Sequence, residues 1–272
     1  GRAGASDDRQ TGAGGCDAAG DRGAHARLVR DGNKRGARAV QVIVAISVIL
    51  GGVGGAIWGW YIPAVLRWAM ADPTINARRR WTLTSASLAG AAVPVVAANS
   101  ATVLAWWWFA GCGVALAAGD VARHRLPNRL VLPAITGGVL WLLLAVIVPW
   151  PTQENGNVVW TPSPYEWSDW GRALLAAGAV GVAYLALAML SPSGLGMGDV
   201  KLSPLVGLYL GWSSWTLVVW GVFLGFVAGA ILAMVAAMSQ HGRLRSRMTA
   251  QVPFGPAMLA GAAIAAGATG GI

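Results

Sequence analysis

Two isolated carboxylates are the residues of this sequence that could carry out chemistry. Asp120 is the only acidic residue between positions 73 and 153, and Asp199 is the only one between positions 170 and 272. A carboxylate at membrane depth is costly unless it is paired, hydrated or functional. Two carboxylates held close together share a proton, and such a pair can activate water against an amide carbonyl. We therefore expect Asp120 and Asp199 to form an aspartic dyad.

The composition predicts the kind of protein that must position these acids. The chain has 272 residues, of which 56% are hydrophobic and 11% are charged. Soluble domains carry about 25% charged residues, so this deficit indicates a lipid bilayer as the surroundings. The formal net charge of +9 comes from bases that lie between apolar segments, which is typical of membrane topology and not of a nucleic-acid-binding domain. We expect an all-α, polytopic integral membrane bundle with no nucleic-acid partner.

Eight segments account for the apolar residues, and most approach the ~20 residues that span a hydrocarbon core. They cover residues 40–62, 82–98, 101–119, 129–149, 170–190, 202–211, 213–238 and 253–271. The segment 202–211 is short. Residues 39–272 are therefore expected to form one transmembrane domain. Residues 1–38, rich in Gly, Ala, Asp and Arg, are expected to be a disordered polar tail that could be artefactual.

The distribution of bases predicts an orientation, because positively charged loops stay in the cytoplasm. If the eight segments alternate, nearly all bases of the loops fall on one side together with Asp120 and Asp199. The opposite side receives Arg172, three acids and the Trp-rich loop between Trp150 and Trp170, which we expect to be an interfacial cap. This orientation places the N-terminus outside although bases that include Arg27, Arg30, Lys34, Arg35 and Arg38 precede the first segment. An artefactual tail would remove this conflict.

The cysteines and histidines do not indicate a metal site. Cys16 lies in the polar tail and Cys112 lies inside an apolar run, while His25, His124 and His241 share no ligand spacing. We expect neither a metal nor a cofactor. An aspartic dyad needs neither.

The local sequences around the acids predict how each is presented. Asp120 ends an apolar segment and is followed by R-H-R-L-P-N, in which Pro and Asn should stop the helix. Asp199 follows Gly194, Gly196 and Gly198, which permit positive φ angles and close backbone approach. We expect a non-helical loop there, lining a water-filled cavity. Taken alone, Asp120 would more simply be a surface ion pair, and Gly-rich strings are weak indications in a chain with 38 glycines.

Three segments resemble the signature regions of the type IV prepilin leader peptidases, a family of GxGD membrane aspartyl proteases. They are G-D-V-A-R-H-R-L-P-N, S-G-L-G-M-G-D-V-K-L and V-P-F-G-P-A-M-L-A-G, and the similarity covers about residues 100–265. The resemblance implies an aspartic endopeptidase with Asp120 and Asp199 as its catalytic pair. It would cleave the leader from prepilin-like or pseudopilin-like precursors of type IV pili and secretion systems, at the cytoplasmic face of the inner membrane.

The resemblance also implies supporting roles. Gly196 and Gly198 would shape the active-site loop, and Lys201 would lie beside Asp199, where its charge could lower a carboxylate pKa or hold the loop. A lysine whose charged end reaches the interface is an equal alternative for Lys201. Residues 253–256 would enter the last helix near the site, with a helix-start turn as their sufficient role.

The sequence departs from the bifunctional members of the family, which also methylate the new N-terminus. Those members carry a large cytoplasmic insert with two Cys pairs, and residues 67–81 leave no room for one here. We therefore regard methylation as doubtful. Two other functions stay open: a proton-coupled transporter or channel that uses the same acids as a relay, and a presenilin-like intramembrane protease. The helix exit after Asp120 argues against the first, and Gly119, where that second class usually has Tyr, argues against the other.

Overall fold

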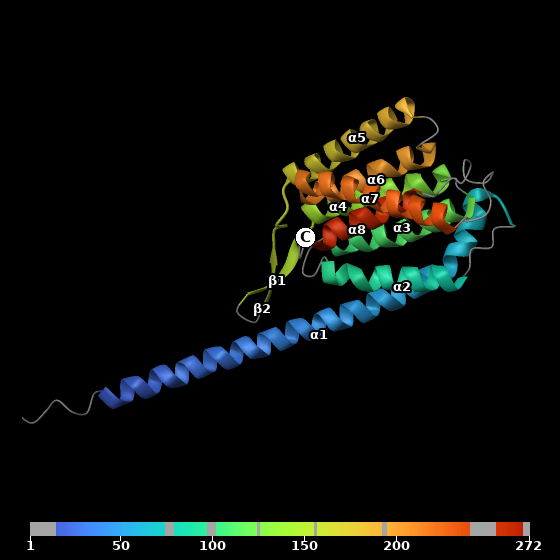
Figure 1. The fold of residues 1–272 in the computed structure, drawn as a ribbon. Coiled ribbons are helices and arrows are strands. Elements are labelled where there is room, and N and C mark those ends of the chain that lie inside the picture. The colour runs from blue at the N-terminus through green and yellow to red at the C-terminus, as the bar shows by residue number, and fades with distance from the viewer. Residues whose placement is uncertain are drawn as a thin grey trace, which may run out of the picture. The chain divides into compact units, whose positions relative to one another are not determined.

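The computed structural model describes residues 15–73, 79–96, 102–123, 126–154, 157–191, 195–239 and 254–268. Within these stretches the chain forms eight helices and one short β-hairpin (Figure 1). The elements are α1 (Gly15–Met70), α2 (Arg79–Val96), α3 (Val103–Arg123), α4 (Asn128–Ile147), β1 (Trp150–Glu154), β2 (Asn157–Thr161), α5 (Trp167–Leu190), α6 (Met197–Ser213), α7 (Trp215–Ser239) and α8 (Gly255–Ala268).

Five of these helices contain stretches long and apolar enough to cross a membrane. They are Ala45–Met70 within α1, Val103–Arg123, Asn128–Ile147, Trp167–Leu190 and Trp215–Ala236 within α7. Helix α8 is a shorter apolar helix. Each of the eight predicted segments lies largely within one helix, and the short segment 202–211 lies in α6. The prediction of a helical membrane bundle is confirmed.

The chain divides into two compact units, Gly1–Ile46 and Ser47–Ile272. In the first unit, α1 begins at Gly15, inside the segment that we expected to be disordered. Ala and Arg have high helix propensity, and the run A-H-A-R-L-V-R of this unit consists mostly of good helix formers. Residues 1–14 lie outside the described part of the chain. The second unit contains all the other elements.

A two-stranded hairpin replaces part of the loop that we predicted between Trp150 and Trp170. Strand β1 pairs with β2 in antiparallel register, with Trp150 opposite Thr161 and Glu154 opposite Asn157. The two residues between the strands are Asn155 and Gly156. Asn-Gly is the strongest sequence signal for a two-residue hairpin turn, so the local sequence accounts for this addition to an otherwise helical fold.

Helices α1 and α2 approach each other through glycine. A Cβ atom at Gly55 would lie 2.1 Å from the carbonyl oxygen of Ala86, and one at Gly90 would lie 2.2 Å from the carbonyl oxygen of Gly51. The two backbones are therefore in direct contact, as small residues allow in membrane helix pairs. Any larger side chain at these positions would push the helices apart.

Helix α6 lies at the centre of the second unit. Residues 205–212 are all buried, and α6 packs most extensively against α5. Arg172 of α5 donates hydrogen bonds to the last carbonyls of α6: to Gly211 at 2.8 Å, to Ser213 at 3.2 Å, and to Trp212. A cation at a helix C-terminus satisfies free carbonyls and complements the helix dipole. Arg172 thereby fixes α6 at the end opposite Asp199.

Candidate active site

Asp120 lies in the last turn of α3 and is buried, with 7% of its surface exposed. The preceding residue explains how α1 can pack against this turn. A Cβ atom at Gly119 would lie 3.1 Å from Met70 Cε and 3.2 Å from Leu66 Cδ2, so glycine leaves room for α1. A larger residue at this position would require the side chains of Met70 and Leu66 to shift.

The Asp120 carboxylate meets the beginning of α8. The backbone N–H of Gly255, the first residue of α8, donates a hydrogen bond of 3.1 Å to Asp120 Oδ2. Helix N-termini carry unsatisfied N–H groups and partial positive charge, so they stabilise anions. A Cβ atom at Gly255 would lie 2.9 Å from Asp120 Oδ2, closer than real Cβ atoms come. Glycine is therefore required here for the carboxylate to reach the helix end.

Asp199 lies in the first turn of α6 and is likewise 7% exposed. Its Oδ2 accepts a hydrogen bond of 3.2 Å from the N–H of Gly196, the N-cap residue, and its own N–H donates to the Gly196 carbonyl at 3.0 Å. This is the acceptor half of a capping box. Asp199 therefore stabilises the helix end on which it lies, and that helix end stabilises its negative charge.

The expected loop around Asp199 is shorter than we predicted. Helix α6 already begins at Met197, so Gly198 and Asp199 are helical, and Gly196 has a φ of −76°. Gly198 allows a neighbouring side chain to approach the backbone closely, and its role is not a positive φ angle. A Cβ atom at Gly198 would lie 3.3 Å from Leu126 Cδ1. Leu126 follows α3 closely, so this contact ties the start of α6 to the end of α3. Gly194 lies outside the described residues.

Contacts around the two acids bring their helices together. Leu202 lies one turn after Asp199 on the same face of α6, and its Cδ2 atom is 3.5 Å from a Cβ position at Gly255, the donor to Asp120. Asp199 lies ahead of the apolar segment of α6 and outside the five candidate spans. Burial raises its pKa to about 6, the charge of Asp120 acts in the same direction, and the Gly196 hydrogen bond lowers the pKa.

The other residues that the sequence placed near the two acids differ in their exposure and ion pairing. Lys201 is exposed on α6, and within the described part of the chain it forms no ion pair. Arg123, three residues after Asp120, pairs with Asp72. His124, Arg125 and Pro253 lie outside the described residues. No three His, Cys, Asp or Glu side chains gather among the described residues in a way that could hold a metal ion.

Two residues near the acids were not singled out by the sequence. Gly255 had been expected to enter the last helix near the site, with a helix-start turn as its sufficient role; it does begin α8, but it also holds Asp120. Tyr184 of α5 is 2% exposed and lies close enough to Asp199 to interact with its charge. The signal that could have found Gly255 is its place within the third signature segment. Tyr184 gives no such signal except as a lone phenol in an apolar helix.

The fold and the site define a class of protein: a helical membrane protein with two acids buried where helix ends meet. A family model described as the type IV leader peptidase family matches residues 102–234, which include both acids. The resemblance is confirmed over these residues, which are similar to that family of peptidases. No curated protein and no solved structure matches the chain.

Proposed function

We propose that the protein is a membrane aspartic endopeptidase that cleaves the leader from type IV prepilin-like or pseudopilin-like precursors, with Asp120 and Asp199 as its catalytic pair. The observation that carries the proposal is the burial of both acids and the response of the Asp199 pKa to the charge of Asp120. Both lie within the region that matches a peptidase family. The excess of basic loops beside the acids supports a cytoplasmic active site in the inner membrane.

The surroundings of the two acids support different roles for them. Both carboxylates accept an N–H at a helix N-terminus, Asp120 from Gly255 and Asp199 from Gly196, so the raised pKa of Asp199 decides the assignment and Asp120 is the base. Asp199, with a raised pKa of about 6, holds the shared proton and is the acid. Paired carboxylates whose environments differ in this way divide the work of aspartic proteases.

The reaction then follows from these two protonation states. Asp120 accepts a proton from a water molecule as the water oxygen bonds to the carbonyl carbon of the scissile peptide. Asp199 gives its proton to the carbonyl oxygen, and a neutral tetrahedral diol forms. In the second step, the carbon–nitrogen bond breaks, the leaving nitrogen takes the proton from Asp120, and a diol hydroxyl returns a proton to Asp199. Both acids are thereby restored, and no metal or cofactor is required.

Neutral isosteres of the two acids test this proposal. Asp120→Asn and Asp199→Asn, each in the full-length protein in membranes, should lower leader cleavage of a co-expressed prepilin by more than about 10³-fold, because each removes one partner of a concerted pair. Asp169→Asn is the matched control: Asp169 accepts the N–H of Glu166 at the start of α5 and pairs with Arg172, far along the chain from both acids. Cleavage retained by either active-site variant would exclude the assignment.

A further inference from the structure

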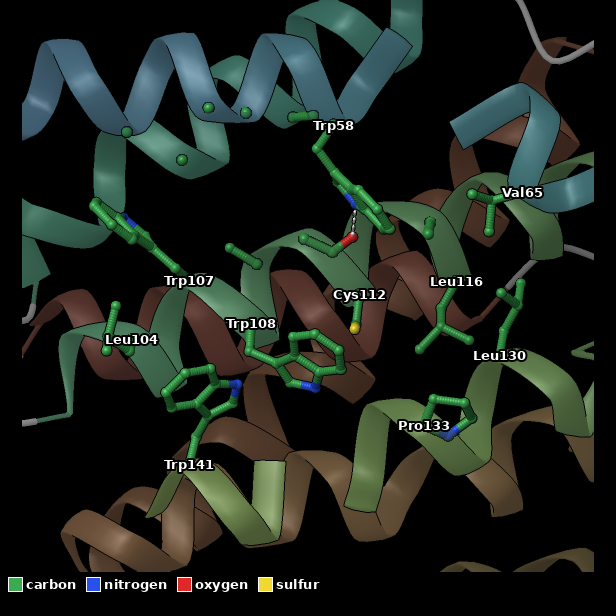
Figure 2. A pocket seen from close by; sticks show the side chains of 18 of the residues that line it. Trp58, Val65, Leu104, Trp107, Trp108, Cys112, Leu116, Leu130, Pro133 and Trp141 are labelled. Atoms are coloured by element: carbon green, nitrogen blue, oxygen red, sulfur yellow. Dashed lines mark hydrogen bonds between the residues drawn. The ribbon is translucent and has the colours of Figure 1, made fainter. Parts of the chain in front are cut away.

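A second region of the membrane bundle is hollow. Helices α1 to α4 line a partly open cavity of about 520 Å³, which neither Asp120 nor Asp199 lines (Figure 2). Its volume falls within the roughly 300–1,000 Å³ of small-molecule sites. Two of the tryptophans around it turn their polar edges to the backbone: Trp58 Nε1 donates to the Gly111 carbonyl at 2.9 Å and Trp108 Nε1 to the Ala134 carbonyl at 3.1 Å. The lining is therefore apolar.

The cavity is elongated along α3. Its lining runs from Leu104 to Leu116, twelve residues apart, which is about 18 Å along a helix axis. Figure 2 shows Trp107, Trp108 and Trp141 gathered at one end, and Leu116 with its neighbours from α1 and α4 at the other. The second end lies one helical turn before Asp120. A long, thin and flexible apolar ligand fits such a shape.

One end of the cavity carries a cation. Of the described residues that line the cavity, Arg129 alone is charged. Its guanidinium lies 5.9 Å from the centre of the Trp68 ring, and none of the ion pairs among the described residues includes it. The side chain is exposed, so the charge lies at the mouth of an apolar cavity. This combination would recognise an amphipathic molecule with an anionic head and an apolar chain.

We propose that this cavity binds one acyl chain of an anionic phospholipid, with the lipid phosphate at Arg129. Charge and shape favour this occupant: one end of the cavity carries the exposed guanidinium of Arg129, and the rest of the long lining is apolar. Guanidinium groups bind phosphate through paired hydrogen bonds, which favours a phospholipid over an uncharged lipid.

Gly54 provides a way to fill the cavity without disturbing the protein. It lines the cavity, and a Cβ atom there would meet no other atom within 4 Å. Gly54→Leu should weaken the binding of phosphatidylglycerol at least about tenfold, because each acyl methylene that is displaced weakens binding about fourfold. Gly54→Ala should have a smaller effect. The control is Gly178→Leu on α5, where a Cβ atom is equally unobstructed but lies outside the cavity.

The head-group contact is tested separately. Arg129→Gln should lower the affinity for phosphatidylglycerol about fivefold and that for phosphatidylcholine with the same chains by less, because the choline cation offsets the phosphate charge. Arg80→Gln, an exposed base on α2 that does not line the cavity, is the control. Native mass spectrometry of the full-length protein in detergent, titrated with either lipid, counts bound lipids, and size-exclusion chromatography checks folding.

Three results would overturn the proposal. The first is equal phosphatidylglycerol binding by Gly54→Leu, Gly178→Leu and the unmodified protein. The second is an unchanged preference for phosphatidylglycerol in Arg129→Gln. The third is a prepilin peptide that is cleaved with a higher KM by Gly54→Leu while lipid binding is unaffected, which would assign the cavity to the apolar segment of a substrate.

Discussion

The two carboxylates of the site are held in opposite ways. Asp120 lies at the C-terminal end of its own helix and is held by an N–H group 135 residues later in the chain. Asp199 lies at the N-terminal end of its own helix and is held by an N–H group three residues earlier. The position of Asp199 is therefore a local property of G-M-G-D, whereas that of Asp120 depends on the docking of α8.

The two acids also differ in the helix dipole that each one meets. A negative charge at a helix C-terminus is unfavourable, so the dipole of α3 disfavours an ionised Asp120, and the N-terminus of α8 compensates for it. Asp199 has a favourable dipole from α6 already, but it is buried beside Asp120. Disturbing the distant contact should therefore affect catalysis more than disturbing the local one.

Among variants that keep both acids and disturb only their contacts, Gly255→Ala should have the largest effect. The new methyl group would lie 2.9 Å from Asp120 Oδ2 and 3.5 Å from Leu202 Cδ2, so the carboxylate must move and its hydrogen bond must lengthen. A displacement of about 1 Å at a catalytic group lowers the rate about 10²-fold. We expect kcat for leader cleavage to fall by about that factor. Gly267→Ala, on the same helix where a Cβ atom meets nothing within 4 Å, should retain full activity. Equal activity of the two variants would show that the α8 contact is dispensable.

The same contrast explains what the sequence could predict about the site. The two acids were found because they stand alone in acid-free halves of the chain, and Gly196 and Gly198 because they lie beside Asp199. Gly255 was expected near the site in a helix-start turn, but its contact with Asp120 was not predicted, because it joins distant segments whose docking no local pattern specifies. Tyr184 was missed for the same reason. The catalytic roles of Asp120, Asp199 and Lys201 stay predictions until cleavage is measured.

The second prediction concerns pH. The pKa of Asp199 is raised to about 6, so its proton is present below that pH and is lost as the pH rises through it. Because the proposed reaction needs that proton on the acid, kcat/KM for leader cleavage should fall about tenfold per pH unit above about pH 6. Initial rates between pH 4.5 and 8 would measure this decline, and Asp169→Asn should reproduce the profile. A flat profile up to pH 8 would contradict the acid role of Asp199.

The third prediction disturbs the local contact. In Gly196→Ala, the methyl group would lie 3.3 Å from Asp199 Oδ2, and the backbone there, with a φ of −76° and a ψ of 148°, is accessible to alanine. The N–H donor is kept, so the carboxylate need shift only slightly. We expect about a threefold to fivefold loss of kcat, with alanine also a poorer N-cap than glycine. A loss as large as that of Gly255→Ala would remove the distinction between the local and the distant contact.

The fold was more predictable than the site. Hydrophobic runs alone placed the helices, including the short α6, because membrane spans must satisfy their backbone within one segment. Two parts of the fold were not predicted, namely the helical start of α1 and the β-hairpin. The apolar-poor start of α1 gave no periodicity, and residues 150–154 and 157–161, taken as parts of a loop, form two paired strands.

The smallest effect should appear in stability, where the two acids should respond in opposite directions. The pKa of Asp199 rises from 3.8 to about 6 in the folded protein, so above pH 6 its charge destabilises the native state, and that penalty disappears as the pH falls towards 4. Asp199→Asn removes the charge and keeps an oxygen for the Gly196 N–H. At pH 7, the midpoint of thermal unfolding of this variant should lie roughly 2–4 °C above that of the unmodified protein, the shift for about 1 kcal/mol in a chain of this size. At pH 4, the two midpoints should be equal. Asp120→Asn, which loses a charge-assisted hydrogen bond to α8, should unfold at the same or a lower temperature. Thermal unfolding in detergent at the two pH values measures both, and a lowered midpoint for Asp199→Asn at pH 7 would show that its local hydrogen bond outweighs the cost of its burial.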